Sequence, residues 1–380
     1  MYRVVIDARS AVAARSGIGA YAEALIRHMV PLAGDMRFLV IRHPARSAEL
    51  VRSERVEHME FAGETKSLHT VLSLGRRHDF RDYDLYHSPA DIVPRGLNCP
   101  WVVTLHDLMW VEKPHLAASY APVRIVNSAW YRLNFAHAIS GARRIIAISR
   151  ATADAISRVY PHAAHKVRVV HHGVDHAYFA AGAAGPRSRL DKWIPPEKRY
   201  SLIVGQGSPY KNHDGMICAF LEATRSDSDH MLVLVRRFRR RDSKMRRLLA
   251  RPDARKKVVV LPFVSDEDLR ALLTHARMLL FASHYEGFGM PALEAMSLGT
   301  PVLASNAAAL VEVTADAALQ PDPTNQRELE QSIALLDTDE ALRARLIAAG
   351  RRRAGDFSWD ACASATLAVY REAIAAGKAG

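Results

Sequence analysis

Short apolar segments alternate with longer amphipathic segments through most of the chain. The short segments have the length and composition of buried strands, and the longer ones carry apolar residues at helical spacing. Strands that alternate with helices favour parallel sheets joined by crossover helices. The expected strands of the first half are YRVVID, MRFLVI, VEHMEF, DLYHS, WVVTLHD, RRIIAIS and KVRVVHHGV.

The strand pattern restarts near residue 200, after a segment that resembles a linker. Residues 175–199 are rich in Gly, Pro, Ala and charge, which is typical of a connection between domains. A chain of 380 residues is long enough for two domains with separate cores. The expected strands of the second half are SLIVGQG, MLVLV, KVVVLPF, RMLLFAS and PVLAS, and the clearest helical patterns cover residues 20–30, 123–138, 325–336, 340–354 and 358–374.

The most informative segment is HYEGFGMPALEAMSLGTPVLAS, residues 284–305. It follows a buried strand with a Gly-rich turn, and Pro291 can open a helix because its missing N–H costs nothing in the first turn. The turn and the helix start then present free N–H groups and the positive end of a helix dipole, which suits a phosphate. We assign the amides of Gly287, Phe288, Gly289 and Met290 to this cradle.

Two glutamates eight positions apart flank the cradle. Glu286 lies in the turn and can bind sugar hydroxyls, whereas Glu294, expected in the first helical turn, can bind a diol such as ribose. A bare pair of this spacing could equally be a solvated loop residue and a residue that complements the helix dipole. The glycines and proline between the two favour a nucleotide-sugar site.

Three further positions carry candidate chemistry at the ends of expected strands. Lys211 follows SLIVGQG and could balance phosphate charge, although it could also be a surface lysine in a turn. His106 ends WVVTL, where a catalytic role competes with simple packing. Gly17 and Gly19 follow the first strand and would let a ligand approach the backbone closely. Asp7, which ends that strand, is assigned a structural role.

Composition narrows the class of partner. The net charge is +12, and residues 236–247 form the richest basic cluster, which is either a solvated helix face or a contact for phosphate or anionic membrane. No nucleic-acid-binding motif accompanies it, so we expect no nucleic-acid partner. Cys99, Cys218 and Cys362 lack metal-ligand spacing, and no apolar run reaches 18 residues. We expect a cytoplasmic protein without signal peptide, membrane span or structural zinc, in peripheral contact with the inner face of the membrane.

The chain resembles the retaining family-4 glycosyltransferases, which have the GT-B fold of two Rossmann-like, doubly wound α/β domains facing a cleft. The residues that carry the resemblance span nearly the whole chain: SGIGAYAEALIRHM, YHSP, VTLHDL, IIAIS, HHGVD, PYKN, LPFVSDEDL, the Glu286–Glu294 motif, VEVTADAALQPDP and FSWDACA. The details are most similar to bacterial transferases that use GDP-mannose or a related donor to build surface polysaccharides or lipopolysaccharide.

The resemblance implies an N-terminal, acceptor-side domain over residues 1–175 and a nucleotide-sugar domain over 176–357. It further implies that residues 358–380 form a helix that crosses back to the first domain. It assigns Lys211 to the donor phosphates, His106 to the donor sugar or acceptor, and Phe263 and Val264 to the nucleobase. The acceptor would be a saccharide or a lipid-linked saccharide.

The chain departs from the family pattern beside Lys211. Relatives usually carry an arginine there, whereas this chain has Gln206 and Tyr210 at the two places; we count Gln206 among the donor-binding residues. Arg236, or its neighbour Arg237, could replace the missing cation. Asp82 and Asp84 spell the metal-binding pattern D-x-D but precede a strand, so we read them as exposed loop residues and expect neither metal nor cofactor.

Three other activities stay open at this point. A nucleotide-sugar epimerase of the same fold would need no acceptor, and a non-catalytic protein would bind the donor without turnover. A Rossmann dehydrogenase is disfavoured because G-I-G lacks the third glycine of the dinucleotide fingerprint.

Overall fold

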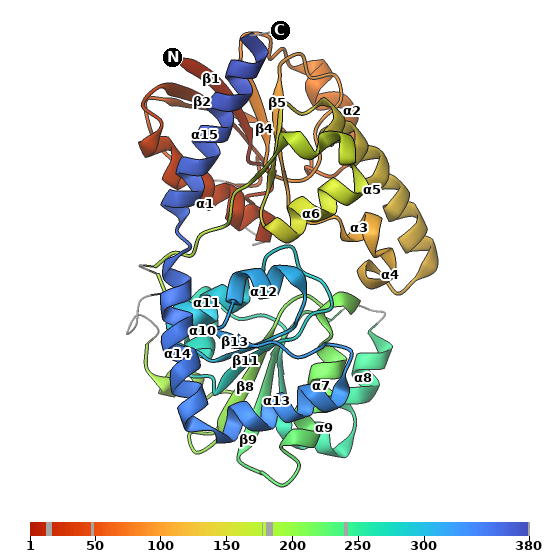
Figure 1. The fold of residues 1–380 in the computed structure, drawn as a ribbon, viewed down its shortest axis with the longest axis vertical. Helices are drawn as coiled ribbons and strands as arrows, with labels where there is room; N and C mark the ends of the chain where they lie inside the picture. The colour runs from red at the N-terminus through yellow and green to blue at the C-terminus, as the bar shows by residue number, and fades with distance from the viewer. Residues whose placement is uncertain (13–16, 47–48, 177, 180–184, 239–241, 379–380) are drawn as a thin grey trace. The chain divides into compact units, whose positions relative to one another are not determined.

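Two parallel α/β sheets organise the protein, shown as a computed structural model in Figure 1. The structure describes residues 1–12, 17–46, 49–176, 178–179, 185–238 and 242–378. The chain forms two compact units. Unit 1 comprises Met1–Pro114, Ala121–Gly173 and Phe357–Gly380, and unit 2 comprises His115–Tyr120 and Val174–Asp356.

Unit 1 contains a seven-stranded sheet in the order β3-β2-β1-β4-β5-β6-β7, with every neighbouring pair parallel. Its strands are β1 (Tyr2–Asp7), β2 (Met36–Arg42), β3 (Val56–Glu60), β4 (Leu85–Ser88), β5 (Trp101–Leu105), β6 (Arg144–Ala147) and β7 (Val167–Val169). Its helices are α1 (Gly17–Leu32), α2 (Leu68–Arg77), α3 (Met109–Glu112), α5 (Ala121–Gly141), α6 (Arg150–Val159) and α15 (Trp359–Lys378), and the short α4 (Pro114–Ala117) lies at the unit boundary.

Unit 2 contains a six-stranded parallel sheet in the order β10-β9-β8-β11-β12-β13. Its strands are β8 (Arg199–Val204), β9 (His230–Val235), β10 (Val258–Leu261), β11 (Met278–Phe281), β12 (Val302–Ala304) and β13 (Ala318–Leu319). Its helices are α7 (His213–Ala223), α8 (Ser243–Leu249), α9 (Pro252–Lys257), α10 (Asp266–Thr274), α11 (Met290–Leu298), α12 (Ala308–Thr314), α13 (Gln326–Thr338) and α14 (Glu340–Gly355).

This architecture confirms the doubly wound α/β fold expected from the sequence. All twelve expected strands are present, and β13, only two residues long, is the strand that the pattern did not reveal. Ser265 caps α10, since its side chain accepts a hydrogen bond from the Asp268 N–H. The first helix begins at Gly17, three residues earlier than predicted, so Gly17 and Gly19 lie inside it. Ser16 and residues 239–241 of the basic cluster lie outside the described part of the chain.

The last helix, α15, packs against α1 in unit 1, although more than 300 residues separate them in sequence (Figure 1). The contact contains a buried polar chain. The hydroxyl of Tyr370 lies 2.6 Å from His87 Nδ1, and His87 Nε2 lies 2.9 Å from the hydroxyl of Thr104. Thr104 also meets the hydroxyl of Tyr21 at 3.1 Å. Burial, together with nearby His106, lowers the pKa of His87 to about 3, so this ring is neutral.

A second buried polar group fixes the end of β1. Both nitrogens Nε and Nη2 of Arg9 bind the Asp7 carboxylate, at 2.7 and 2.6 Å, and the Tyr86 hydroxyl donates to the same carboxylate at 3.0 Å. Arg9 is 2% exposed and also donates to the hydroxyl of Thr70. A buried charge needs this degree of pairing. The contacts are consistent with the structural role assigned to Asp7.

Candidate functional site

The strand order of unit 2 reverses between β8 and β11. The chain continues from β8 to β9 on one side of β8, and from β11 to β12 on the opposite side of β11. The connections that leave β8 and β11 therefore run in opposite directions. Open α/β sheets bind ligands at such switch points. The two loops contact each other, since the His284 N–H donates to the Tyr210 carbonyl at 2.7 Å. The carboxyl edge of the sheet at β8 and β11 is therefore the candidate site.

This edge brings together two residues that the sequence analysis selected separately. Lys211 Nζ lies 2.7 Å from Glu286 Oε1, and the two side chains are only 12% and 10% exposed. The ammonium group also lies 4.9 Å from the ring centre of Phe281 and 5.1 Å from that of Tyr210. Glu286 is therefore the counter-ion of Lys211 in a largely desolvated environment, where charge interactions are stronger than in water.

The turn between Glu286 and α11 has the expected form. Gly289 caps the helix with a φ of 118°, a conformation that favours glycine. A Cβ at this position would also lie 2.6 Å from Leu310 Cδ2, so both backbone and space require glycine. Gly287 is half-buried and Phe288 is buried. Helix α11 begins at Met290, which places its first N–H groups at the same edge as Lys211.

Glu294 does not lie in the first turn of α11, as the sequence analysis expected. The helix begins one residue earlier than Pro291, so Glu294 is its fifth residue, and the first turn contains no acidic side chain. The alternative interpretation was that the Glu294 carboxylate stabilises the helix by complementing its dipole. That effect is confined to the first turn, so the half-buried Glu294 does not have this role. Its assignment to a donor diol stays a prediction.

Arg236 lies beside the loop that follows β8, but it already has a counter-ion. Its guanidinium is 6% exposed, pairs with Asp242 at 3.0 Å and packs on the backbone of Gly207, where a Cβ would come within 2.4 Å of it. His213 lies 3.4 Å from Arg236. Burial, then the charges of Arg236 and Lys211, lower the pKa of His213 to about 3, so two cations border a neutral ring.

The remaining donor candidates lie on the loops of neighbouring strands. Phe263 follows β10 and is 69% exposed, with the Arg237 guanidinium 5.4 Å from its ring centre, and Val264 is half-buried. Gln206 is exposed in the loop after β8. The exposed ring of Phe263 offers a flat apolar surface of the kind that stacks on a base.

In unit 1, His106 lies just beyond β5 and is held on three sides. Its backbone N–H donates to Asp91 Oδ1 at 2.7 Å, its ring Nε2 lies 2.9 Å from the Pro89 carbonyl, and its ring lies edge-on to Tyr21 with ring centres 5.1 Å apart. Exposed Gly17 and buried Gly19 lie in the first turn of α1. His106 and the two glycines thus belong to unit 1, and the other candidate residues to unit 2.

The sequence analysis missed two residues that control His106. Asp91 is buried and has a φ of 68°, a conformation that aspartate tolerates better than most residues. Lys66 Nζ binds the Oδ2 atom of Asp91 at 2.8 Å. The quoted motif YHSP ends two residues before Asp91. Lys66 directly precedes Ser67, the N-cap residue of α2. Its neighbours in the sequence give no sign that it lies near His106.

Asp82 and Asp84 lie before β4, at the amino edge of the sheet, and Asp82 is exposed. Asp84 is half-buried rather than exposed, because its side chain accepts the Arg3 N–H at 2.8 Å.

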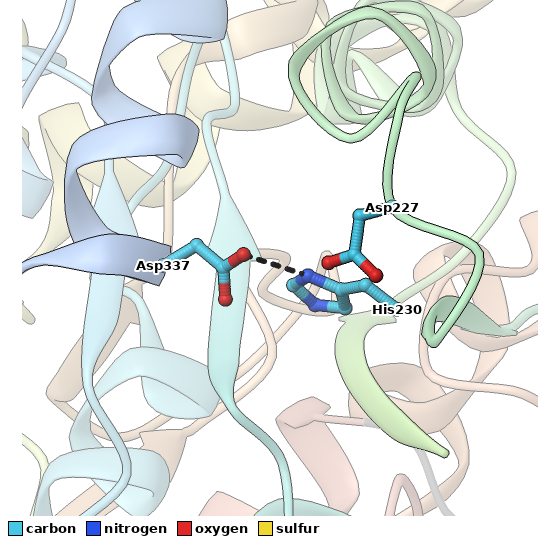
Figure 2. Close-up of side chains that lie close together, drawn as sticks. All are labelled: Asp227, His230 and Asp337. Atoms are coloured by element: carbon cyan, nitrogen blue, oxygen red, sulfur yellow. Dashed lines mark hydrogen bonds and ion pairs between the residues drawn. The ribbon is translucent and has the colours of Figure 1, made fainter.

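Within the described chain, three side chains of unit 2 have ligand atoms close enough for a metal ion: Asp227, His230 and Asp337. Figure 2 shows both carboxylates turned toward the His230 ring, with His230 Nδ1 3.2 Å from Asp337. The group lies at the amino edge, where β9 begins. His230 Nε2 is held by the Ser201 hydroxyl at 2.9 Å.

Arginines already occupy these carboxylates. Arg199 pairs with both Asp227 and Asp337, and Arg277 binds Asp337 at 3.1 Å. Burial would raise the pKa of Asp337, but hydrogen bonds from His230 and Arg199 outweigh it and lower the pKa below its ordinary value. The group is best described as a buried ion-pair cluster that ties α13 to the starts of β8 and β9.

Asp337→Asn should lower the free energy of unfolding by about 1–3 kcal/mol at neutral pH, because it removes the acceptor charge from two arginines and a histidine. The pKa of Asp337 in the folded state lies below its ordinary 3.8, so its contribution is complete above that pH and is lost on acidification below it. The stability difference from wild type, measured by urea unfolding, should therefore shrink as the pH falls below about 4.

Zinc provides the control for this assignment. Micromolar Zn²⁺ should leave the melting temperature of both proteins unchanged. A zinc-dependent rise in the wild type that Asp337→Asn abolishes would show that the cluster binds a metal.

Comparisons with known proteins agree with the geometry. Residues 15–178 match the family "Glycosyltransferase Family 4", and residues 187–353 match "Glycosyl transferases group 1". The O-antigen chain mannosyltransferase B of Escherichia coli is 29% identical over 294 residues, which cover 77% of this chain and 75% of that protein. The D-inositol 3-phosphate glycosyltransferase of Salinispora arenicola is 31% identical over 320 residues, 77% of this chain and 70% of that protein.

Among solved structures, that of Anabaena HepE in complex with UDP and glucose superposes with a TM-score of 0.72. The sequence identity is 18%, and the match covers 97% of this chain and 98% of that chain. This likeness shows the fold, and the relative that is 31% identical, together with the two family matches, shows that the chain belongs to glycosyltransferase family 4, a family of retaining enzymes with the GT-B fold.

Proposed function

We propose that this glycosyltransferase transfers mannose from GDP-mannose to a saccharide or lipid-linked acceptor. The observation that carries the proposal is the pairing of Lys211 with Glu286 at the switch point of unit 2, beside the start of α11. The pairing joins a cation and a carboxylate at one edge, beside the Gly-rich turn and the positive end of the α11 dipole, and this combination supports a nucleotide-sugar site. The Escherichia coli relative, named as a mannosyltransferase, supports the choice of sugar.

In this proposal, the donor diphosphate binds the N–H groups of residues 287–290 and takes Lys211 from Glu286. The released Glu286 carboxylate then accepts hydrogen bonds from the sugar hydroxyls. The bond between the sugar C1 and the diphosphate oxygen breaks, the acceptor oxygen bonds to C1 on the same face, and the acceptor proton passes to the departing phosphate. Negative charge grows on the leaving group, so Lys211 stabilises the transition state more than the bound donor.

The nucleobase is assigned to Phe263 and Val264. The solved structure of HepE contains UDP, so UDP is the competing nucleotide in a test of the base. A thermal-shift screen of GDP, UDP and ADP tests it, since a ligand at a hundredfold excess over its Kd stabilises a protein by about 2.7 kcal/mol. A clear preference for GDP supports mannose, and a preference for UDP would contradict it.

Lys211→Ala should weaken GDP binding about tenfold to a hundredfold, because a charge-assisted hydrogen bond contributes roughly 1.5–3 kcal/mol. Glu286→Gln should retain or strengthen GDP binding, because it frees Lys211, yet it should lower kcat. Calorimetry with GDP and initial rates with GDP-mannose measure both effects. Lys198→Ala is the matched control, since Lys198 also pairs with a carboxylate, that of Asp229 at 2.8 Å, but lies at the amino edge of the sheet, just before β8.

Normal binding and turnover by Lys211→Ala would show that the phosphate site is built otherwise. The two alternative activities give different results in the same assays. An epimerase would change the donor sugar without an acceptor, whereas a non-catalytic protein would bind GDP-mannose and transfer to no acceptor.

Excess chelator should leave the transfer rate largely unchanged, because protein groups rather than a metal ion are assigned to the diphosphate. The measurement is initial rate with and without EDTA after dialysis. Loss of activity that Mg²⁺ or Mn²⁺ restores would contradict the assignment.

We further propose that helix α5 contacts an anionic membrane surface. In the described chain, no helix is long and apolar enough to cross a bilayer. The exposed face of α5 is nevertheless apolar. Its exposed apolar side chains are Ala121, Pro122, Val123, Ile125, Val126, Ala129, Leu133 and Ala136, and its exposed polar side chains are Arg132 and Ser140.

A surface helix usually shows the opposite pattern, with polar residues outward. Ile125, Val126 and Leu133 are 67%, 66% and 65% exposed, so water contacts most of each side chain. The net charge of +12 and the arginine on this face favour a negatively charged lipid surface as the partner. A cytoplasmic protein held in this way would meet a lipid-linked acceptor at the inner face of the membrane.

The double substitution Ile125→Asp with Val126→Asp should abolish or reduce at least about tenfold the binding to vesicles that contain phosphatidylglycerol, because it removes apolar area and adds two like charges. Co-sedimentation measures the binding. Leu335→Asp, at an exposed apolar site on α13, is the control and should bind normally. Unchanged binding of the double variant would exclude α5 as the contact.

A further inference from the structure

The imidazole of His213 lies near both cations of the candidate site in unit 2. His213 is the first residue of α7, two positions after Lys211, and it is 3% exposed. Its Nδ1 lies 3.4 Å from Nη1 of Arg236. Burial, then the charges of Arg236 and Lys211, lower the pKa of His213 to about 3 against the opposing charges of Asp214 and Asp242, so the ring is neutral near pH 7.

The contact with Arg236 determines which ring nitrogen carries the proton. A guanidinium group can only donate hydrogen bonds, so His213 Nδ1 accepts from Arg236. The proton of the neutral ring is then on Nε2. Among the described residues, no group accepts a hydrogen bond from this nitrogen, and it is not one of the fully enclosed polar atoms that lack a partner. His213 Nε2 is therefore a donor that a ligand can reach.

Gly205 shows where this donor is directed. It follows β8 directly, with a φ of 153°. A Cβ at this glycine would lie 3.5 Å from His213 Nε2 and 3.7 Å from Lys211 Cδ, which are ordinary contact distances. One atom can thus fit over the Gly205 backbone, between the imidazole and the aliphatic stem of the lysine. A phosphate oxygen near this position would come within hydrogen-bonding reach of the Nε2–H.

Asn212 holds the start of α7 at the carboxyl edge of the sheet. It is the N-cap residue of α7, but its side chain does not cap the helix. Its Nδ2 instead donates to the carbonyls of Ala282 and Pro323, at 3.2 and 2.9 Å. Ala282 directly follows β11, so these bonds fix His213 and Lys211 beside the turn that leads to α11.

We propose that His213 is a further binding residue for the donor diphosphate, with its Nε2–H donating a hydrogen bond to a phosphate oxygen. Arg236 is then a positioning residue that acts through His213, because its own charge is paired with Asp242 and its guanidinium holds the imidazole in one tautomer. His213 supplies a neutral donor beside Lys211, where relatives usually carry an arginine. The proposal rests on the nucleotide-sugar function and adds a residue to that site.

The test compares two substitutions of His213 by their affinity for the nucleoside diphosphate that the wild type binds, GDP or UDP. His213→Leu fills the space but removes the donor, so it should weaken binding about tenfold. His213→Gln places an amide N–H near the position of Nε2 and should stay within about threefold of wild type. His275→Leu is the control, since His275 follows α10 just before β11, at the amino edge, and should bind normally. Calorimetry measures the affinities.

Nuclear magnetic resonance of protein with ¹⁵N-labelled histidine gives a readout that a packing role would not change. The free wild type should show His213 protonated at Nε2, identified by the signal that His213→Gln lacks, and the nucleotide should shift the signals of Nε2 and its proton. A proton on Nδ1, normal binding by His213→Leu, or an equal loss in the Leu and Gln variants would overturn the proposal.

The same measurements separate this proposal from the proposed function. A wild type that binds GDP or UDP but transfers no sugar contradicts the transfer reaction alone, and the comparison of His213 variants still decides the role of His213. A wild type that binds neither nucleotide would overturn both.

Discussion

The parallel direction of every strand pair is the constraint on which the arrangement of both units depends. A parallel sheet needs a crossover between successive strands, so all carboxyl ends meet at one edge and all amino ends at the other. In unit 2 this rule brings Lys211 and Glu286 within 2.7 Å although 75 residues separate them. It also places the Asp227, His230 and Asp337 cluster at the far edge, where it serves cohesion rather than ligand binding.

The pairing of Lys211 with Glu286 links stability and function in one contact. A half-desolvated lysine without a counter-ion would be costly, and Glu286 offsets that cost. The same contact keeps the carboxylate and the ammonium within reach of one ligand. Arg236 differs from Lys211 in its contacts. Its guanidinium pairs with Asp242 and packs on the backbone of Gly207, beside the loop after β8. Of the two cations, Lys211 has the partner that a donor could replace.

The apolar pattern was sufficient to predict twelve of the thirteen strands, since a parallel strand buried on both faces is a continuous apolar run, and it predicted the five longest helices, α1, α5, α13, α14 and α15. It failed at β13, because two residues carry no periodicity, and at the first turns of α1 and α11, where glycines and a proline leave the start ambiguous. The loop residues Lys211 and Glu286 were found because glycine and proline mark their turns. Lys66 and Asp91 were not, because their contact with His106 depends on packing between loops distant in sequence.

The position of Tyr370 in α15 has a consequence for the order in which the protein can fold during synthesis. Unit 1 is discontinuous, and its last segment begins at Phe357. The ribosome synthesises the chain from the N-terminus, so all of unit 2 is synthesised before Tyr370 can contact His87. Until then the surface of unit 1 that packs against α15 stays exposed to solvent. Residues 174–356, which form most of unit 2, are a long loop between two segments of unit 1, and this loop closes only when α15 binds. The twenty residues of α15 thus complete unit 1, the part of the chain whose synthesis begins first.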